Sequence, residues 1–85
     1  MEYRLAMLDI DGTLQHAGSW NPGAPELLDL LRTRGITVAL CSGRTSASMT
    51  WLGDRVPHAA FVAANSGSTV WERVGDEWTV LAHRS

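Results

Sequence analysis

The sequence predicts an α/β fold in which three parallel strands alternate with two helices and a β-hairpin follows. Three apolar runs typical of buried strands are separated by two segments with helical features, and such alternation predicts a parallel sheet. The final stretch contains two strand-like runs around a Gly-Asp turn, which is typical of a hairpin. At 85 residues the chain has room for one small domain, so we interpret residues 1–85 as a single domain.

The first expected strand spans residues 4–10, an almost continuous apolar run that ends at turn-forming Asp-Gly chemistry. Residues 14–20 are expected to be irregular or to form a small hairpin. A helix is then expected from Pro22 or Ala24 to Arg34, with Asn21 as its cap and Gly35 as its C-terminal stop. Its apolar face is expected to carry four leucines: Leu27, Leu28, Leu30 and Leu31.

The second half of the chain continues the alternation. The expected elements are a strand at 36–41, a helix at 46–53, a strand at 60–64, and hairpin strands at 68–73 and 77–82. With Gly75-Asp76 as the hairpin turn, Arg73 lies opposite Trp78, which predicts a cation–π pair.

One face of the predicted sheet is expected to lack a cover. If the three parallel strands lie side by side in chain order, right-handed crossovers place both helices on the same face. The first strand is nevertheless apolar on both faces, with Leu5 and Met7 on one and Ala6 and Leu8 on the other. The sequence therefore predicts half of a doubly wound sandwich, whose second face something else covers.

Three polar clusters follow the three parallel strands, at residues 9–13, 42–44 and 65–67. Ligands of open parallel sheets bind beyond the carboxyl ends of the strands, so the clusters are expected to share one site. Asp9 and Asp11 are close enough to repel, so one is expected to have a raised pKa unless a cation lies between them. Such a pair serves as nucleophile and general acid, or as ligands for a hard cation, while a serine hydroxyl and helix-opening N–H groups bind phosphate.

The segment D-I-D-G-T-L at 9–14 resembles the first motif of the haloacid dehalogenase (HAD) superfamily. The segment G-I-T-V-A-L-C-S-G-R at 35–44 is similar to the second motif of its sugar-phosphatase branch, the Cof-type enzymes with a type IIB cap. Asn65-Ser66-Gly67 resembles the N-G step that precedes a hairpin in that branch. The resemblance implies the N-terminal half of a Rossmann-like core, without the cap and the second half of the core.

The resemblance also implies a chemistry. Asp9 would attack a phosphate and form an aspartyl-phosphate, and Asp11 would protonate the leaving oxygen and later activate water. Asp9 and the backbone carbonyl of Asp11 would bind Mg²⁺, while Ser42 and the Gly43 backbone would hold phosphoryl oxygens. The implied substrate is a small phosphorylated metabolite such as a sugar phosphate.

Other predicted site residues keep alternative roles. Thr13 would support the first motif, Arg44 would contact substrate or stabilise the second-motif turn, and Asn65 would contact substrate or only form a turn. Ser42 is also a candidate cap for the second helix. Cys41 is interpreted as a small buried residue rather than a nucleophile, because no histidine is placed to activate it.

The sequence departs from the family pattern in one informative way. All seven basic residues are arginine, so lysine is absent, and no acidic residue follows Asp76 and Glu77, whereas the family uses a later lysine or arginine and a later acidic group that completes the metal site. We therefore expect these groups to come from a partner or from further chain, and residues 1–85 to be incomplete alone. Two alternatives remain: phosphotransfer by the same residues, and a non-catalytic module that self-associates through its uncovered sheet face or the free edge of the first strand.

Composition excludes several other functions. The net charge of −2 gives no reason to expect nucleic acid or an anionic membrane as partner. One cysteine makes neither an internal disulfide nor a cysteine zinc site, and His16, His58 and His83 are not spaced as metal ligands. The first apolar run is too short for a signal peptide or membrane helix, so a soluble cytoplasmic protein is expected. Four tryptophans are many for this length, and at least one is a candidate for an interface.

Overall fold

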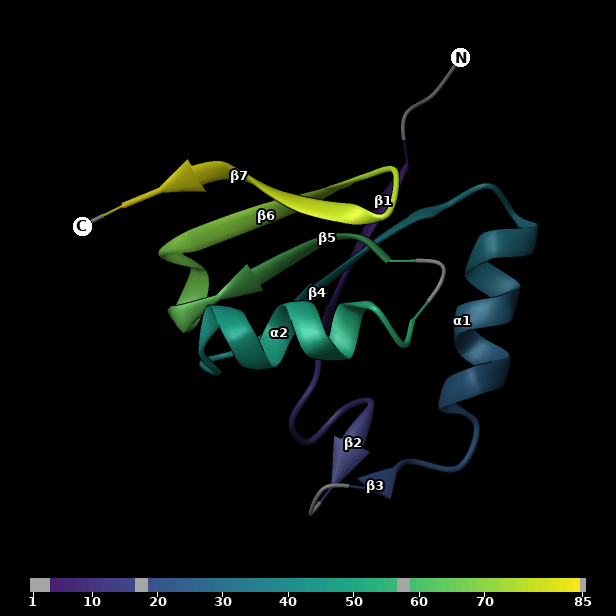
Figure 1. The fold of residues 1–85 in the computed structure, drawn as a ribbon. Coiled ribbons are helices and arrows are strands. Elements are labelled where there is room, and N and C mark those ends of the chain that lie inside the picture. The colour runs from purple at the N-terminus through teal and green to yellow at the C-terminus, as the bar shows by residue number, and fades with distance from the viewer. Residues whose placement is uncertain (1–3, 17–18, 57–58, 85) are drawn as a thin grey trace.

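The computed structural model describes residues 4–16, 19–56 and 59–84, and these form the expected α/β fold (Figure 1). The large sheet has the order β1-β4-β5-β6-β7, in which β1, β4 and β5 are parallel and β6 and β7 form an antiparallel hairpin. Its strands are β1 (Leu5–Asp9), β4 (Thr37–Cys41), β5 (Ala59–Ala64), β6 (Thr69–Val74) and β7 (Glu77–His83). The other elements are the small hairpin of β2 (Gln15–His16) and β3 (Ser19–Trp20), the helices α1 (Ala24–Thr33) and α2 (Ser46–Gly53), and the 3-10 turn η1 (Asn65–Gly67).

The parallel strands are in a register that aligns their carboxyl ends. Asp9 of β1 pairs with Cys41 of β4, and Cys41 pairs with Ala63 of β5. The loops that leave these three strands therefore start from neighbouring points on one edge of the sheet. This register brings the three polar clusters of the sequence to that edge.

Helix α1 begins differently from the sequence expectation. Its cap is Gly23, with a φ of 88° that favours glycine, and Pro25 lies in the first turn. The predicted cap, Asn21, is wrong because its side-chain amide donates a hydrogen bond to the Thr13 carbonyl. Asn21 thus holds the preceding loop, while Gly35 with a φ of 70° ends the helix as expected.

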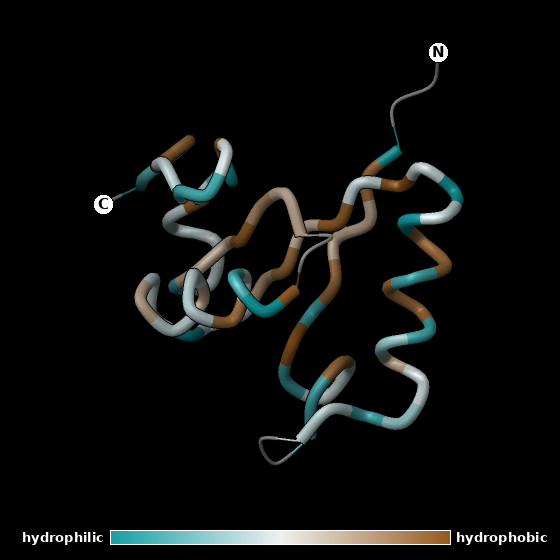
Figure 2. Tube along the Cα trace, turned by 45° about the vertical axis from the view of Figure 1, so that its right-hand side comes forward, coloured by the Kyte–Doolittle hydropathy of each residue, from teal (hydrophilic) through white to brown (hydrophobic). Residues whose placement is uncertain are grey.

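The buried stripe of α1 is narrower than expected. Leu28 is buried with Ala24, and Leu31 packs partly against the same core, at the i, i+4, i+7 spacing of a single helical stripe. Leu27 and Leu30 are 38% and 47% exposed, so the prediction of four leucines on one buried face is wrong. Figure 2 shows how hydrophobic and hydrophilic residues alternate along this helix.

Helix α2 covers the expected residues, and Thr45 caps it. The Thr45 hydroxyl accepts a hydrogen bond from the Ser48 N–H at 3.3 Å. The alternative role of Ser42 as the cap is therefore wrong, and its hydroxyl is used elsewhere. Met49 and Leu52 bury the inner side of the helix. Neither described helix has the length and apolar character needed to cross a membrane.

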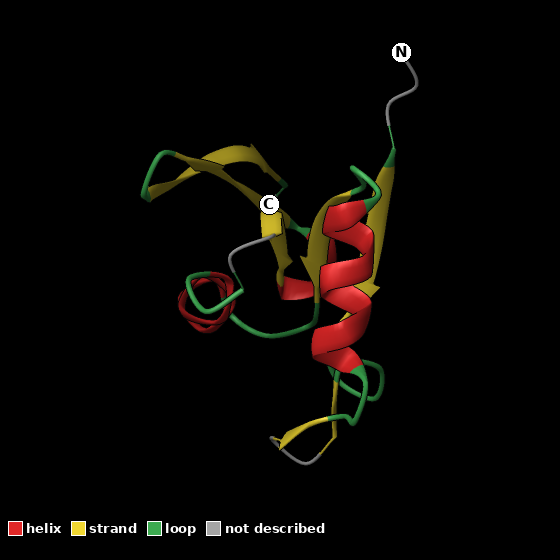
Figure 3. Cartoon of the chain, turned by 90° about the vertical axis from the view of Figure 1, so that its right-hand side faces the viewer, coloured by secondary structure: helices red, strands yellow, loops and turns green. Residues whose placement is uncertain are grey.

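Both helices pack on the same face of the sheet, as the crossover rule predicts (Figures 1 and 3). Val38, Leu40 and Val62 project from the strands into one fully buried core that both helices share. On the opposite face Met7 is 63% exposed and Leu81 is 57% exposed. We call this opposite surface the bare face.

The C-terminal hairpin is attached to α2 by one arginine. The Arg73 guanidinium donates hydrogen bonds to the carbonyls of Gly53, Val56 and Ala59, all at or after the end of α2. It also stacks over the Trp78 ring at 4.5 Å, which confirms the predicted cation–π pair. The Trp78 indole in turn covers Gly53, where a Cβ would lie 2.5 Å from the ring. Arg73 therefore gives charged donors to three carbonyls at and beyond the end of α2, of which those of Gly53 and Val56 also accept backbone hydrogen bonds.

Replacement of Arg73 by methionine is expected to lower the free energy of unfolding by about 2 kcal/mol or more, because three carbonyls lose a charged donor. The matched control is Arg55→Met, since exposed Arg55 also stacks on a tryptophan, Trp51, at 3.7 Å, but its guanidinium donates, among the described residues, to the Trp51 carbonyl alone. The control is expected to cost at most about 1 kcal/mol. Urea unfolding followed by tryptophan fluorescence measures both, and equal losses would contradict the role assigned to Arg73.

Candidate functional site

The loop after β1 is a tightly wound turn built on one carbonyl. The Ile10 carbonyl accepts hydrogen bonds from the N–H groups of Thr13, Leu14 and Gln15 at 3.3, 3.0 and 2.8 Å. Ile10 and Leu14 are 0% and 1% exposed, so both ends of the turn are anchored in the core. Asp11 lies between these two buried residues and is presented at the surface.

The Asp11 carboxylate is held by two side chains of the β4–α2 loop. The Ser42 hydroxyl donates to Asp11 Oδ2 at 3.0 Å. The Arg44 guanidinium donates through Nε to Oδ2 at 3.1 Å and through Nη2 to Oδ1. The pair is thus a bidentate ion pair, the geometry in which arginine binds a carboxylate most specifically.

This arrangement decides the electrostatics of Asp11. Its pKa lies below the ordinary value because of the hydrogen bond from Arg44 first and that from Ser42 second, against a small opposing effect of desolvation. The sequence left two alternatives for the carboxylate pair, a raised pKa or an intervening cation. Arg44 is a cation beside Asp11, so mutual repulsion does not raise the pKa of this carboxyl.

Asp9 lies in a different environment. It is exposed at the end of β1, and among the described residues no side chain donates a hydrogen bond to its carboxylate. Its neighbour across the sheet is Cys41, whose pKa is raised by burial and, to a smaller extent, by the Asp9 charge. The half-buried thiol donates weakly to the Leu8 carbonyl at 3.6 Å, which agrees with a packing role for Cys41. Of the two carboxylates, that of Asp11 is hydrogen-bonded by side chains, whereas that of Asp9 is exposed.

The third cluster is tied to the second by backbone hydrogen bonds. The Asn65 N–H donates to the Arg44 carbonyl at 2.7 Å, and the Ser66 N–H donates to the Ser42 carbonyl at 3.1 Å. Asn65 and Ser66 adopt φ values of 52° and 56°, a left-handed conformation that costs energy in residues other than glycine. A Cβ on Gly43 would lie 3.3 Å from the Ser66 hydroxyl, so the two loops pack closely.

The structure joins some of the predicted site residues and not others. Asp11, Ser42 and Arg44 form one hydrogen-bonded cluster, and Asn65 reaches it only through its backbone. Within the described residues, no hydrogen bond connects the side chain of Thr13 or of Asn65 to this cluster. Their predicted contacts with substrate remain predictions.

Sequence reasoning missed Gln15. Its side chain accepts a hydrogen bond from Arg44 Nη2 at 3.1 Å although the residue is only 7% exposed. The available signal was a polar residue directly after apolar Leu14, in the segment expected to be irregular or to form a small hairpin. The histidines add nothing to the site: His16 is exposed, His83 bonds Thr69 in the hairpin, and His58 lies outside the described residues.

Two oxygens fit a hard cation. Within the described part of the chain, no group of three or more His, Cys, Asp or Glu side chains is arranged to hold a metal. Both Asp11 carboxylate oxygens are engaged by Arg44 and Ser42, but the Asp11 backbone carbonyl accepts no described backbone hydrogen bond. The Asp9 carboxylate and this carbonyl therefore remain, and Mg²⁺ usually completes such a pair with waters and substrate oxygens.

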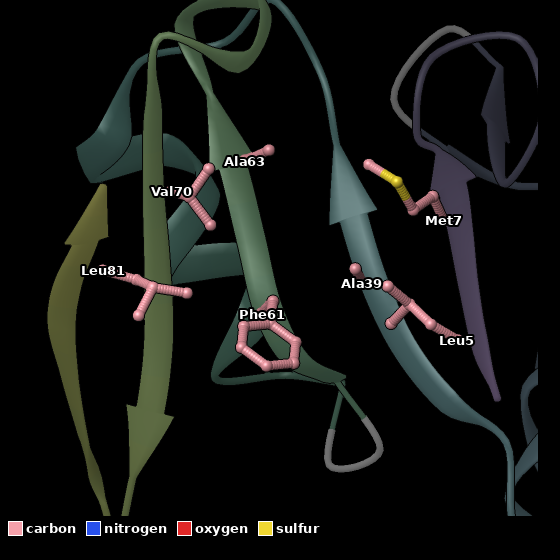
Figure 4. Close-up of a pocket in the computed structure, with 7 residues that line it drawn as sticks. All are labelled: Leu5, Met7, Ala39, Phe61, Ala63, Val70 and Leu81. Carbon is pink, nitrogen blue, oxygen red and sulfur yellow. The ribbon is translucent and has the colours of Figure 1, made fainter. Parts of the chain in front are cut away.

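One apolar groove of the structure lies away from this site. It has a volume of about 260 Å³ and is on the bare face (Figure 4). It is lined by Leu5, Met7, Ala39, Phe61, Ala63, Val70 and Leu81. Because every lining side chain is apolar, the groove offers no chemistry to a phosphorylated substrate.

Comparison with known proteins agrees with this geometry. Residues 6–67 match the family model of the haloacid dehalogenase-like hydrolases. Among solved structures, the HAD-superfamily phosphatase BT1666 of Bacteroides thetaiotaomicron matches with a TM-score of 0.74 and 24% identity, covering 95% of this chain and 29% of that one. A hypothetical protein of Geobacillus kaustophilus matches with a TM-score of 0.76 and 23% identity, covering 98% and 31%.

A third similar structure comes from work on a trigonal-bipyramidal intermediate in a phosphoryl-transfer superfamily. It has a TM-score of 0.70 and 21% identity and covers 99% of this chain and 32% of that one. At these identities the likenesses show a common fold. The present chain spans about a third of the length of each of these proteins.

Replacement of Arg44 by methionine is expected to raise the pKa of Asp11 toward its ordinary value of 3.8, because the main cause of the depression is removed. Ser42→Ala is expected to raise it less, and Arg32→Met, in the exposed part of α1, to leave it unchanged. Carbon-13 NMR of the aspartate carboxyls during an acid titration measures all three. A larger rise in Ser42→Ala than in Arg44→Met would contradict the assigned order.

Replacement of Arg44 by methionine is also expected to change how stability depends on pH in acid. A carboxyl whose folded pKa is depressed contributes stability that is present above its unfolded pKa and is lost as the pH falls through the folded pKa. The native chain is therefore expected to have a higher free energy of unfolding than Arg44→Met. This difference is expected to be largest near neutral pH and to shrink as the pH falls below 3.8, the ordinary pKa of the Asp11 carboxyl. Urea unfolding at several pH values measures it.

Proposed function

Since its family model spans residues 6–67, this chain belongs to the haloacid dehalogenase-like hydrolases, and we propose that its site hydrolyses phosphomonoesters with Mg²⁺. Asp9 is the proposed nucleophile and Asp11 the proposed acid and base, acting on a small phosphorylated metabolite such as a sugar phosphate. The observation that carries the proposal is the difference between the two carboxylates. Asp9 is exposed and without a side-chain partner among the described residues, whereas Arg44 and Ser42 orient Asp11.

In the proposed reaction an Asp9 oxygen attacks phosphorus while the bond from phosphorus to the leaving oxygen breaks. Asp11 would give a proton to that oxygen once substrate binding has weakened its ion pair with Arg44, which lowers the Asp11 pKa, and an aspartyl-phosphate remains. Asp11 then takes a proton from water, which attacks phosphorus and releases inorganic phosphate and free Asp9. Bound Mg²⁺ would neutralise phosphoryl charge, held by the Asp9 carboxylate and the Asp11 carbonyl. Transfer to an acceptor other than water would use the same residues.

The β4–α2 loop supports a phosphate-binding role. The N–H groups of Ser42 and Arg44 are used, by the Ala63 carbonyl and the Ser42 hydroxyl respectively. The N–H of exposed Gly43 donates to no described group and remains for an anion. A glycine also suits this position because the Ser66 hydroxyl already lies 3.3 Å from where a Cβ would be.

Asp9→Asn is expected to lower Mg²⁺-dependent hydrolysis by at least about 1,000-fold, because the nucleophile is lost. Asp11→Asn is expected to act selectively. It should slow hydrolysis of an alkyl phosphate about 100-fold or more and that of p-nitrophenyl phosphate much less, because p-nitrophenolate leaves without a proton. Phosphate release from glycerol phosphate and from p-nitrophenyl phosphate measures this, and turnover that survives in Asp9→Asn would sink the proposed nucleophile.

A second candidate function, a non-catalytic module that pairs with a second copy, is favoured by the bare face. The accessible surface is 5488 Å², whereas a compact monomer of this mass exposes about 5,000 Å². The chain is also a slab of 38 × 34 × 21 Å, as expected for a sheet covered on one side. Exposed Leu5 and Met7 lie on the edge strand β1, where the apolar surface and unpaired backbone groups meet.

This second candidate function predicts that the chain forms a dimer through its bare face. A charged side chain introduced on that face is expected to dissociate the dimer. Met7→Glu is expected to shift the solution mass from dimer to monomer, because the new carboxylate would be buried in the interface. Leu30→Glu is the control, since Leu30 is exposed on α1 and should leave the dimer intact. Light scattering after size-exclusion chromatography measures the mass. A native chain that is monomeric at high concentration would count against the module.

A further inference from the structure

Among the described residues, few hydrogen bonds join the β2–β3 hairpin to distant parts of the chain. In Figure 1 it lies beyond the carboxyl ends of the parallel strands, below α2. Its backbone hydrogen bonds are local, to the turn after β1 and, through Asn21, to Leu14. Within the described residues, the hydrogen bond from Arg44 to Gln15 is the one side-chain hydrogen bond from the hairpin to a distant segment of the chain.

The buried position of Gln15 suits its side-chain oxygen to accept the hydrogen bond from Arg44. It is 7% exposed, and such burial of an amide is costly unless its polar atoms find partners. Its backbone is held on both sides, because its N–H donates to the Ile10 carbonyl and its carbonyl accepts from Gly12. The Gln15 side chain therefore has a fixed starting point, and its oxygen faces Arg44 Nη2.

Arg44 is fixed from the other direction. Its N–H donates to the Ser42 hydroxyl at 3.2 Å, and its carbonyl accepts from Asn65 at 2.7 Å. Its guanidinium Nη2 donates both to Asp11 and to Gln15, so one nitrogen connects the hairpin to the carboxylate. The fork of the guanidinium is rigid and planar, so a shift of Gln15 changes the direction of both bonds to Asp11.

We propose that Arg44 is a positioning residue that sets the orientation of the Asp11 carboxylate according to the place of the β2–β3 hairpin, through the bridge Gln15–Arg44–Asp11. The proposal rests on the proposed function, in which Asp11 acts on the leaving oxygen. It gives Arg44 a role other than the two that the sequence left open, which were contact with substrate and stabilisation of the second-motif turn. A substrate that displaces the hairpin would reorient Asp11 through this bridge, and one that holds the hairpin would keep Asp11 in its present orientation.

The structural part of the test needs no turnover. Gln15→Met keeps the size of the side chain and removes the acceptor, and Arg44→Lys keeps the charge and removes the fork. The control is His16→Ala, an exposed neighbour in the same strand. NMR couplings of Asp11 report its χ1 rotamer, and hydrogen exchange reports the amides of Gln15 and Asn21.

Both variants are expected to convert Asp11 from one χ1 rotamer to an averaged set and to speed exchange of the hairpin amides, whereas His16→Ala changes neither. If Gln15→Met leaves the Asp11 couplings and the hairpin exchange as in the native chain, the proposal is wrong. That outcome leaves the proposed hydrolysis untouched, so the two failures are distinct.

The kinetic part separates positioning from direct binding of substrate. If Arg44 positions Asp11, Gln15→Met lowers kcat for glycerol phosphate roughly 10- to 100-fold with little change in KM, and has less effect on p-nitrophenyl phosphate. Arg44→Lys then shows the same pattern, and the double variant is no worse than the worse single one. If Arg44 binds substrate directly, Gln15→Met has no effect and Arg44→Met raises KM for both substrates, which overturns the proposal.

Discussion

The register of the three parallel strands is the constraint on which the candidate site depends. Pairing of Asp9 with Cys41 and of Cys41 with Ala63 ends β1, β4 and β5 in one row. A slip by one residue would move every buried side chain of a strand to the other face, so the buried Val38, Leu40 and Val62 fix this register. Hydrophobic packing on one side of the sheet thereby determines which polar residues meet at its edge.

At that edge, an ion pair with Arg44 gives Asp11 a different environment from that of Asp9. Close carboxylates repel, and a site that leaves both free would favour protonation of one. Here Arg44 and Ser42 bind Asp11, while Asp9 stays exposed at the strand end. The two aspartates of one short motif thus receive different partners because Asp9 ends β1, whereas Asp11 lies within the turn wound around the Ile10 carbonyl. Different environments are what allow two carboxylates to take different roles.

Local sequence signals predicted the elements well, because each depends on neighbours in the chain. Helix α2 and the hairpin turn follow from apolar spacing and from glycine chemistry. Asn21 was predicted as a cap because it precedes two prolines, yet it bonds Thr13, a contact that local pattern does not encode. Gln15 was missed for the same reason, since its partner Arg44 is 29 residues away. Side-chain partners of high sequence separation are set by the packed fold, and composition gives no measure of them.

The absence of lysine has a structural counterpart in how the arginines are used. Arg44 donates from two nitrogens to Asp11 and Gln15, and Arg73 donates to three carbonyls while it stacks on Trp78. A lysine has one nitrogen on a flexible stem, so it cannot reproduce either planar arrangement. A small domain whose sheet is covered on one face buries little apolar surface. The hydrogen bonds of these two guanidinium groups add to its stability by joining loops and the hairpin to neighbouring segments. The all-arginine composition of the basic residues thus helps to hold the candidate site and the hairpin in place.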